Sequence, residues 1–175
     1  MAVFAGPSSI RLTRLFWFLT SWVLSTFGSA ATKRICREYS HKKMTTLNDI
    51  QTEADVAYFL ERFYERVRQD SDLGHIFDGV AQVNWPTHMP RIIAFWSTIL
   101  LGTNTYGGNP MRPHFELAMK TSFTPAHFDQ WLAYFQQTLT ENFAGPLADE
   151  ALVRAQGIAA VMQSRLYQMG LLVIE

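Results

Sequence analysis

The sequence predicts an all-α domain over residues 44–175. Apolar residues in this part recur at intervals of three and four in four separate segments, which is the spacing of one helix face. Its sequence shows no strand-like alternation, no internal repeat and no glycine-rich phosphate loop. With 48% apolar and 17% charged residues, the chain of 175 residues has the composition of a globular protein and the size of one domain with a real core.

The first helical segment runs from Thr52 to Asp70. Thr52 and Asp55 together form a start signal, because a threonine cap and an acid in the first turn satisfy free amide groups. We expect Gly74 to interrupt the helical pattern and residues 75–77 to form a short turn of helix. The apolar positions of this segment are Val56, Phe59, Leu60, Phe63 and Val67.

The second helical segment precedes a loop. Pro86 fits its start, and Gly102 occupies the position where helices tend to end. Pro90 lies inside the expected first two turns, where a proline should kink the helix or delay its start. The glycine and proline content of residues 104–113 predicts a loop. A short amphipathic segment follows, from His114 to Lys120. The apolar face of the second segment comprises Ile92, Phe95, Trp96, Ile99 and Leu100.

Two further helical segments complete the pattern. The third begins at Thr124-Pro125, a cap residue followed by a proline at the first helical position, and Gly145-Pro146 ends it. The fourth runs from about Asp149 to Met169. Four main amphipathic helices in this length of chain predict a compact helical domain. The apolar face of the third segment comprises Phe128, Trp131, Leu132, Phe135 and Leu139.

Residues 1–43 differ from the rest in composition and charge, and we leave them outside the fold. They carry a net charge of +6, whereas residues 44–175 carry −6. The apolar run over residues 15–27 follows two arginines and precedes small residues, which is typical of a secretory signal or an organelle transit peptide. The run is short for a membrane span. The alternative is that Met44 is the true start and residues 1–43 are an over-extended reading frame.

Several function classes are excluded. The acidic balance of residues 44–175 argues against a nucleic-acid partner, because phosphate binding needs a cationic face. Cys36, the only cysteine, excludes an internal disulfide and a cysteine-based zinc site. The motifs HxxxH, HExxH and GxSxG are absent. We expect no membrane contact for residues 44–175 and a cytoplasmic location, or an exported or organellar one if residues 1–43 are a targeting segment.

Four polar side chains interrupt the apolar faces: Tyr64, His88, His114 and Trp131. Each has a plain structural interpretation, as a boundary tyrosine, a solvated or loop histidine, or a core tryptophan. The functional interpretation of His114 is an axial metal ligand, since neutral imidazole is a common donor to iron and zinc. A single histidine on iron is typical of a haem site, where the porphyrin supplies the other four nitrogens.

The order of several motifs between about residues 47 and 170 resembles that of group III truncated haemoglobins. Each motif alone is weak, but all of them occur in order at the spacing of the family. The matching stretches are Phe63-Tyr64-Glu65-Arg66-Val67, Leu73-Gly74-x-Ile76-Phe77, His88-x-x-Arg91-Ile92-x-x-Phe95-Trp96, Leu100-Leu101-Gly102, Tyr106-x-Gly108-x-Pro110 with His114, and His127-Phe128-x-x-Trp131-Leu132.

The resemblance implies a truncated globin, a two-over-two helical sandwich that holds haem b (iron protoporphyrin IX). His114 then corresponds to the proximal iron ligand, and Arg91 is placed to meet a haem propionate. Pro90 could turn the His88 imidazole into the pocket or out of it. The resemblance implies a distal polar cluster of Tyr64, His88 and Trp131, and an apolar wall of Ile92, Phe95, Trp96, Phe63 and Phe128.

The implied function is that of a five-coordinate haem iron that binds O2, NO or CO. We expect redox chemistry on O2 with NO, or on peroxide, in the manner of an NO dioxygenase or a peroxidase, with an unidentified reductase as partner. Two alternatives remain open. One is a simple O2 carrier or sensor without catalysis, and the other is a haem-free helical interaction module.

Overall fold

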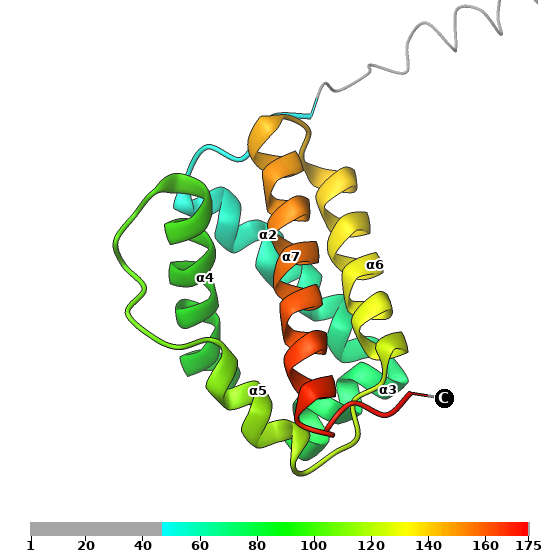
Figure 1. Cartoon of the computed structure of the whole chain (residues 1–175). Helices are drawn as coiled ribbons and strands as arrows, with labels where there is room; N and C mark the ends of the chain where they lie inside the picture. The colour runs from blue at the N-terminus through cyan, green and yellow to red at the C-terminus, as the bar shows by residue number, and fades with distance from the viewer. Residues whose placement is uncertain (1–46, 175) are drawn as a thin grey trace, which may run out of the picture. The chain divides into compact units, whose positions relative to one another are not determined.

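The computed structural model describes residues 47–174, and it is helical throughout apart from loops and one isolated bridge between Phe123 and Leu172 (Figure 1). The all-α prediction is therefore confirmed, and the expectations for residues 1–43 lie outside the described residues. Between residues 47 and 174, no helix is both long and apolar enough to cross a membrane. The elements are α2 (Glu53–Gln69), α3 (Ser71–Gly74), the π-helix η1 (His75–Val80), α4 (Trp85–Leu101), α5 (Met111–Ala118), α6 (Pro125–Asn142) and α7 (Pro146–Gln168).

Two antiparallel helix pairs form the fold. α2 packs against α4, α6 packs against α7, and the pairs join where α2 crosses α6 (Figure 1). The shorter α5 packs on α7. The buried face of α7 is rich in alanine, so its backbone can approach its neighbours closely. These alanines are Ala148, Ala151, Ala155 and Ala159.

The core consists of two clusters of buried side chains. The larger one centres on α2 and α6, where Phe59 meets Phe135 edge to face with ring centroids 4.8 Å apart. Aromatic pairs in this geometry stabilise a core beyond the effect of their area. The smaller cluster lies near the C-terminal end of α7 and contains Phe123 and Phe128. Leu132 of α6 and Ile158 of α7 pack against both clusters and so connect them.

The segment before α2 anchors the start of α7. The Asp49 carboxylate accepts hydrogen bonds from the Leu147 and Ala148 amides, each at 2.9 Å. A carboxylate at a helix N-terminus satisfies free N–H groups and opposes the positive end of the helix dipole. Gly145 has φ +149°, and a Cβ there would lie 2.5 Å from Asp49 Cγ, so this position requires glycine. These bonds thus join the segment before α2 to the start of a helix 98 positions later in the sequence.

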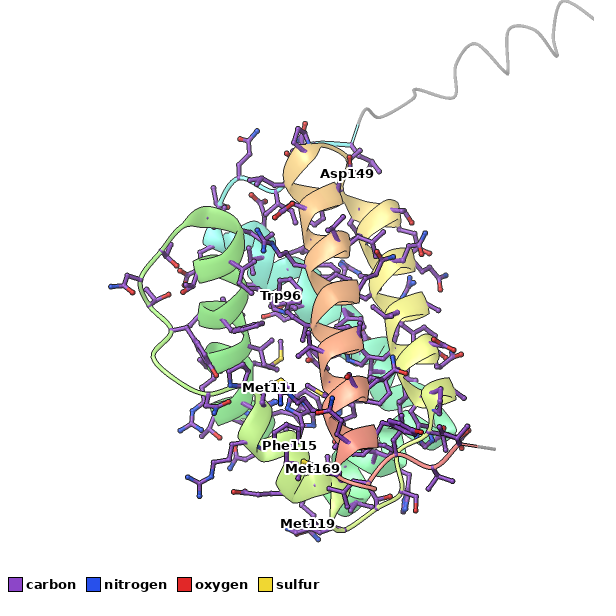
Figure 2. All side chains as sticks on the ribbon, in the orientation of Figure 1. Trp96, Met111, Phe115, Met119, Asp149 and Met169 are labelled. Atoms are coloured by element: carbon purple, nitrogen blue, oxygen red, sulfur yellow. The ribbon has the colours of Figure 1, made fainter. Side chains whose placement is uncertain are left out.

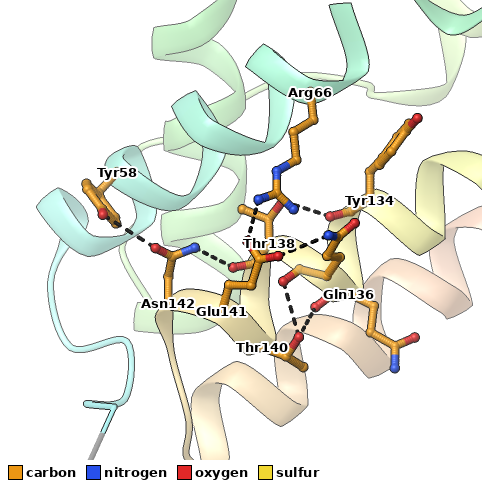
Figure 3. A network of polar contacts seen from close by, with 9 residues as sticks. Tyr58, Arg66, Tyr134, Gln136, Thr138, Thr140, Glu141 and Asn142 are labelled. Atoms are coloured by element: carbon orange, nitrogen blue, oxygen red, sulfur yellow. Dashed lines mark hydrogen bonds and ion pairs between the residues drawn. The ribbon is translucent and has the colours of Figure 1, made fainter. Parts of the chain in front are cut away.

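Polar contacts line the outer edge of the α2–α6 crossing (Figure 3). Arg66 forms an ion pair with Glu141, and Gln137 donates to the same carboxylate at 3.0 Å. Asn142 donates to the Thr138 carbonyl at 2.7 Å. Since the ion pair is partly exposed to solvent, it contributes little stability by itself.

The start signals behave largely as expected. Thr52 and Asp55 form a capping box at α2. Thr124 and Pro125 begin α6, where the Thr124 amide donates to His127 Nδ1 at 3.2 Å. Gly102 ends α4 with φ +67°, a left-handed conformation that suits glycine.

Four local expectations are wrong. Gly74 does not interrupt the helix but has helical dihedral angles between α3 and η1. Of the two effects expected of Pro90, a delayed start is wrong, because α4 begins at Trp85 and continues through the proline, whereas a kink stays a prediction. α5 begins at Met111, inside the expected loop, because Pro113 is tolerated in a first turn where amides have no intrahelical partner. α7 begins at Pro146 rather than at Asp149, since proline suits the first helical position.

Candidate functional site

Apolar side chains on α4 and α5 are only partly covered by the rest of the protein. Ile92 and Phe95 of α4 pack against the larger core cluster, whereas Met111 and Phe115 of α5 pack against the smaller one. Figure 2 shows Met111 and Phe115 in the region between α4 and α7, with Trp96 further along α4. Partly covered apolar side chains on facing elements are typical walls of an apolar ligand site.

His114 lies in this region on the second turn of α5. Its Nδ1 is 2.7 Å from the Pro110 carbonyl oxygen, to which the protonated Nδ1 donates. The bond exists because α5 begins at Met111, so that Pro110 lies one turn before the histidine. Burial lowers the pKa of His114, although the Pro110 carbonyl acts in the opposite direction. The imidazole is therefore neutral at ordinary pH, and Nε2 keeps a free lone pair.

Tyr64 and Trp131 meet where α2 crosses α6. Both rings contact Phe63, with centroid distances of 4.7 Å for Tyr64 and 5.0 Å for Trp131. Burial raises the pKa of the Tyr64 hydroxyl well above its usual range, and the adjacent Trp131 indole partly opposes this shift. The hydroxyl therefore stays protonated at every ordinary pH. The structure thus brings together one hydroxyl and one indole N–H, two hydrogen-bond donors in apolar surroundings.

His88 lies in the first turns of α4, half-buried, with its ring 6.1 Å from that of Trp85. Burial lowers the pKa of His88, and the charges of His114 and Arg91 lower it further. Arg91, one turn along α4, is exposed.

The other predicted pocket residues divide into two groups. Ile92 and Phe95 are partly buried, as a wall facing a ligand should be. Phe63, Trp96 and Phe128 are enclosed by protein: the Phe63 ring is fully buried, Trp96 packs on Phe135 at 5.0 Å, and Phe128 packs on Phe123 at 5.8 Å. Phe63 and Trp96 belong to the larger core cluster, and Phe128 belongs to the smaller one.

Sequence reasoning missed two aromatic residues next to Tyr64. The Tyr64 ring lies 5.3 Å from Trp85 and 5.8 Å from Phe77. A signal for Trp85 was present, because it precedes His88 by three residues and so shares one face of α4. Phe77 follows a glycine that looks like a helix breaker, and this concealed it.

The arrangement combines one neutral imidazole with separate hydroxyl and indole donors. Within residues 47–174 no group of three or more His, Cys, Asp or Glu side chains could hold a bare metal ion. A single imidazole is the protein ligand typical of a haem iron, where the porphyrin supplies the other nitrogens. Two surface hollows, of about 270 and 450 Å³, lie elsewhere, on the α2–α6 edge and on the outer face of α7, and include none of the predicted site residues.

Comparison with known proteins gives one consistent result. The family model described as bacterial-like globin matches residues 45–164. A group 3 truncated haemoglobin from Campylobacter jejuni is 35% identical over 131 residues, which cover 73% of this chain and 98% of the relative. The crystal structure of a group III truncated haemoglobin from C. jejuni superposes with a TM-score of 0.61 at 31% identity, over 71% of this chain and 98% of that one.

The fold agrees with these matches, since the two crossed helix pairs form the two-over-two sandwich that the resemblance implied. The matched region also contains every predicted site residue, from Phe63 to Trp131. This chain belongs to the bacterial-like globin family and resembles the group III truncated haemoglobins within it.

Proposed function

We propose that this chain holds haem b between α4, α5 and α7 through His114, and that it binds O2, NO or CO on the side of Tyr64, His88 and Trp131. Membership of the globin family implies a haem cofactor and small gas ligands such as O2. The geometry of His114 carries the more specific proposal. Its Nδ1 is engaged by Pro110 at 2.7 Å, which leaves Nε2 as the coordinating atom.

The residues present fit a haem group. A lone neutral imidazole suits a metal that arrives with four porphyrin nitrogens. Bonding of Nδ1 to a backbone carbonyl fixes the tautomer and orients the ring, which is the usual outer support of a metal-bound histidine. Partly covered apolar side chains, among them Ile92, Phe95 and Met111, supply the walls that a flat apolar ligand needs. The exposed guanidinium of Arg91 is available for a propionate.

In this proposal, Tyr64 and Trp131 act on the gas ligand that the haem binds. Ferrous haem held by one imidazole leaves one position for a gas ligand. In this proposal the Tyr64 hydroxyl and the Trp131 indole N–H donate to a polar ligand there, and each donor to a charged group contributes roughly 1.5–3 kcal/mol. Such donors favour retention of O2 over rapid delivery. His88, whose lowered pKa keeps it neutral, is able to take up a proton during chemistry on NO or peroxide.

We propose redox chemistry, with electrons from an unidentified reductase, rather than the function of an O2 carrier or sensor. The buried hydroxyl of Tyr64 beside the Trp131 indole supports this choice, because donors to a bound ligand favour retention, whereas a carrier must release its ligand readily. The haem-free module requires that His114 be only a loop histidine, but its ordered Nδ1 contact favours a ligand role.

An absorption spectrum of the purified protein with hemin, before and after dithionite and CO, tests the haem. We expect a Soret band that His114→Ala shifts or abolishes. His127→Ala removes a histidine that caps α6 and serves as the matched control, since it should leave the spectrum unchanged. A protein that stays colourless with hemin, or a His114→Ala variant with the wild-type spectrum, would contradict the assignment.

Stopped-flow measurement of O2 release tests the distal donors. Loss of one such bond should speed dissociation by about ten- to a hundredfold in Tyr64→Phe and in Trp131→Phe. Tyr64→Phe removes only the hydroxyl, whereas Trp131→Phe also removes part of the ring system that packs on Phe63 and Phe135. Fast release in the wild type that neither substitution alters would support the carrier reading instead.

A further inference from the structure

Three side chains from three elements meet beside the Tyr64 ring. The Asp78 carboxylate in η1 accepts from the Trp85 indole N–H at 2.6 Å and from Arg68 Nε at 2.9 Å. The Arg68 guanidinium of α2 also stacks over the Trp85 ring, 5.0 Å from its centroid. Each pair in this cluster is therefore in contact, and the carboxylate joins α2 and η1 to the first residue of α4. We call Arg68, Asp78 and Trp85 the latch.

The latch lies directly over one of the proposed ligand donors. Arg68 follows Tyr64 by one helical turn, so both project from the same face of α2. The Trp85 ring contacts Tyr64 at 5.3 Å, Phe77 at 6.0 Å and His88 at 6.1 Å. With Trp85 in this position the Tyr64 side chain is only 8% exposed. Trp85 thus packs against both Tyr64 and His88 and partly covers them.

The backbone next to Trp85 is set for this placement. Gln82, between η1 and α4, has φ +49°, a left-handed conformation that is uncommon for a residue with a side chain. The following Val83 amide donates to the Phe77 carbonyl at 3.0 Å. Asn84 then caps α4 by accepting from the Thr87 amide at 3.3 Å. A tight, strained turn therefore delivers Trp85 to Asp78 rather than to solvent.

We propose that the latch closes the ligand space on the Tyr64 side and controls how fast a small ligand reaches and leaves it. Asp78 acts as a positioning residue through Trp85 and touches no ligand itself. Because the Arg68 and Asp78 side chains are 48% and 39% exposed, water competes for their bonds and the latch opens readily. Outward movement of Trp85 uncovers Tyr64 and His88 together. This proposal rests on the proposed function, because it concerns access to the same site.

A cover and a donor predict different kinetics. Loss of a donor such as the Tyr64 hydroxyl destabilises the bound ligand and speeds its release alone. Loss of the latch should raise the association rate and the dissociation rate of the small ligand by the same factor, because the ligand crosses the opening step in both directions. The equilibrium affinity should therefore stay within about twofold. From the net strength of one hydrogen bond we expect each rate to rise about three- to tenfold.

Flash photolysis of the ferrous CO complex measures these rates in Asp78→Ala. Trp85→Phe keeps a ring over Tyr64 but removes the indole donor, and it should show the same direction of change. Arg68→Gln provides a third variant in case Asp78→Ala does not fold. The matched control is Glu141→Ala, which breaks the other described ion pair that joins α2 to a neighbouring element but contacts neither Tyr64 nor Trp85.

A second readout is independent of haem. Hydrogen exchange of the Trp85 indole N–H, assigned by its absence in Trp85→Phe, should accelerate in Asp78→Ala both with and without haem. If hemin does not bind, the proposed function fails while this exchange still reports on the latch. Wild-type CO association in a folded, haem-loaded Asp78→Ala protein overturns the latch and leaves the haem assignment intact. A changed equilibrium affinity with unchanged association also overturns it.

Discussion

Gly74 shows how a single residue can be misinterpreted from sequence and then explained by close packing. It has ordinary helical angles, but a Cβ at this position would lie 2.5 Å from the Arg68 carbonyl oxygen. We predict that Gly74→Ala destabilises the protein by about 1–3 kcal/mol, because backbone has to move to relieve the overlap. Thermal unfolding followed by circular dichroism measures the change.

Gly157 is the matched control for this substitution. It also lies within a helix, but nothing lies within 4 Å of a Cβ placed there. Gly157→Ala should therefore raise stability by up to about 1 kcal/mol through helix propensity alone. Equal effects of the two substitutions on the midpoint of unfolding would show that packing at Gly74 is looser than described.

At the residue scale, the sequence indicated which side chains are candidates for the site, but it did not indicate which groups contact them. His114, Tyr64 and Trp131 were singled out as polar side chains that interrupt apolar faces, and the resemblance to truncated haemoglobins supplied their roles, which stay predictions. The Pro110 carbonyl that orients His114 could not be identified, since it depends on where α5 begins. Nothing in the spacing shows that Asp78 meets Trp85, because a strained residue between η1 and α4 sets that contact.

At the scale of elements, Asp70 determines how α2 gives way to α3. Its carboxylate accepts from the Leu73 amide at 2.8 Å, from the Asp72 amide at 3.0 Å and from the Tyr134 hydroxyl of α6 at 2.9 Å. One side chain thus caps a short helix and ties it to another. We predict that Asp70→Ala costs about 1–2 kcal/mol of the free energy of unfolding, the usual cost of losing a cap.

The contribution of Asp70 should depend on pH. The Leu73 amide lowers the pKa of this carboxyl; burial opposes the shift, while the Tyr134 hydroxyl, the Asp72 amide and the His127 charge add to it. A carboxyl with a lowered pKa in the folded state stabilises that state above its unfolded pKa, near 3.8, and loses this contribution as pH falls through the folded value. Urea unfolding at neutral pH and at steps below pH 3.8 should show the gap between wild type and Asp70→Ala closing. A constant gap would contradict this assignment.

The four main helices were predictable because each has an apolar face at helical spacing, and α2, α4 and α6 also have a recognisable start. The shorter elements were not. α5 carries two prolines near its start, at Pro110 and Pro113, and these predict a loop although proline is compatible with a first turn. The helical turn expected at residues 75–77 is present as the start of η1, but nothing in the sequence predicted its length or its π-helical geometry.

At the scale of the whole molecule, the two sides of the domain differ in how completely their apolar side chains are buried. The α2–α6 side contains the fully buried aromatic core, with Phe59, Phe63 and Phe135 at most 1% exposed. The α4–α5 side carries apolar side chains that are only partly covered, among them Ile92 and Phe115. This asymmetry is expected of a fold that completes its core with a bound group.

Hydrogen exchange with and without hemin tests that asymmetry. Without hemin, the amides of α4 and α5 should exchange faster than those of α2 and α6, because local opening is easiest where apolar contacts are fewest. With hemin, ligand binding to the folded state should slow exchange throughout, and most strongly in α4 and α5, where new contacts form. His114→Ala should lose most of this added protection. Equal protection gained by all four helices would mean that hemin stabilises the domain only globally and does not fill the space beside α4 and α5.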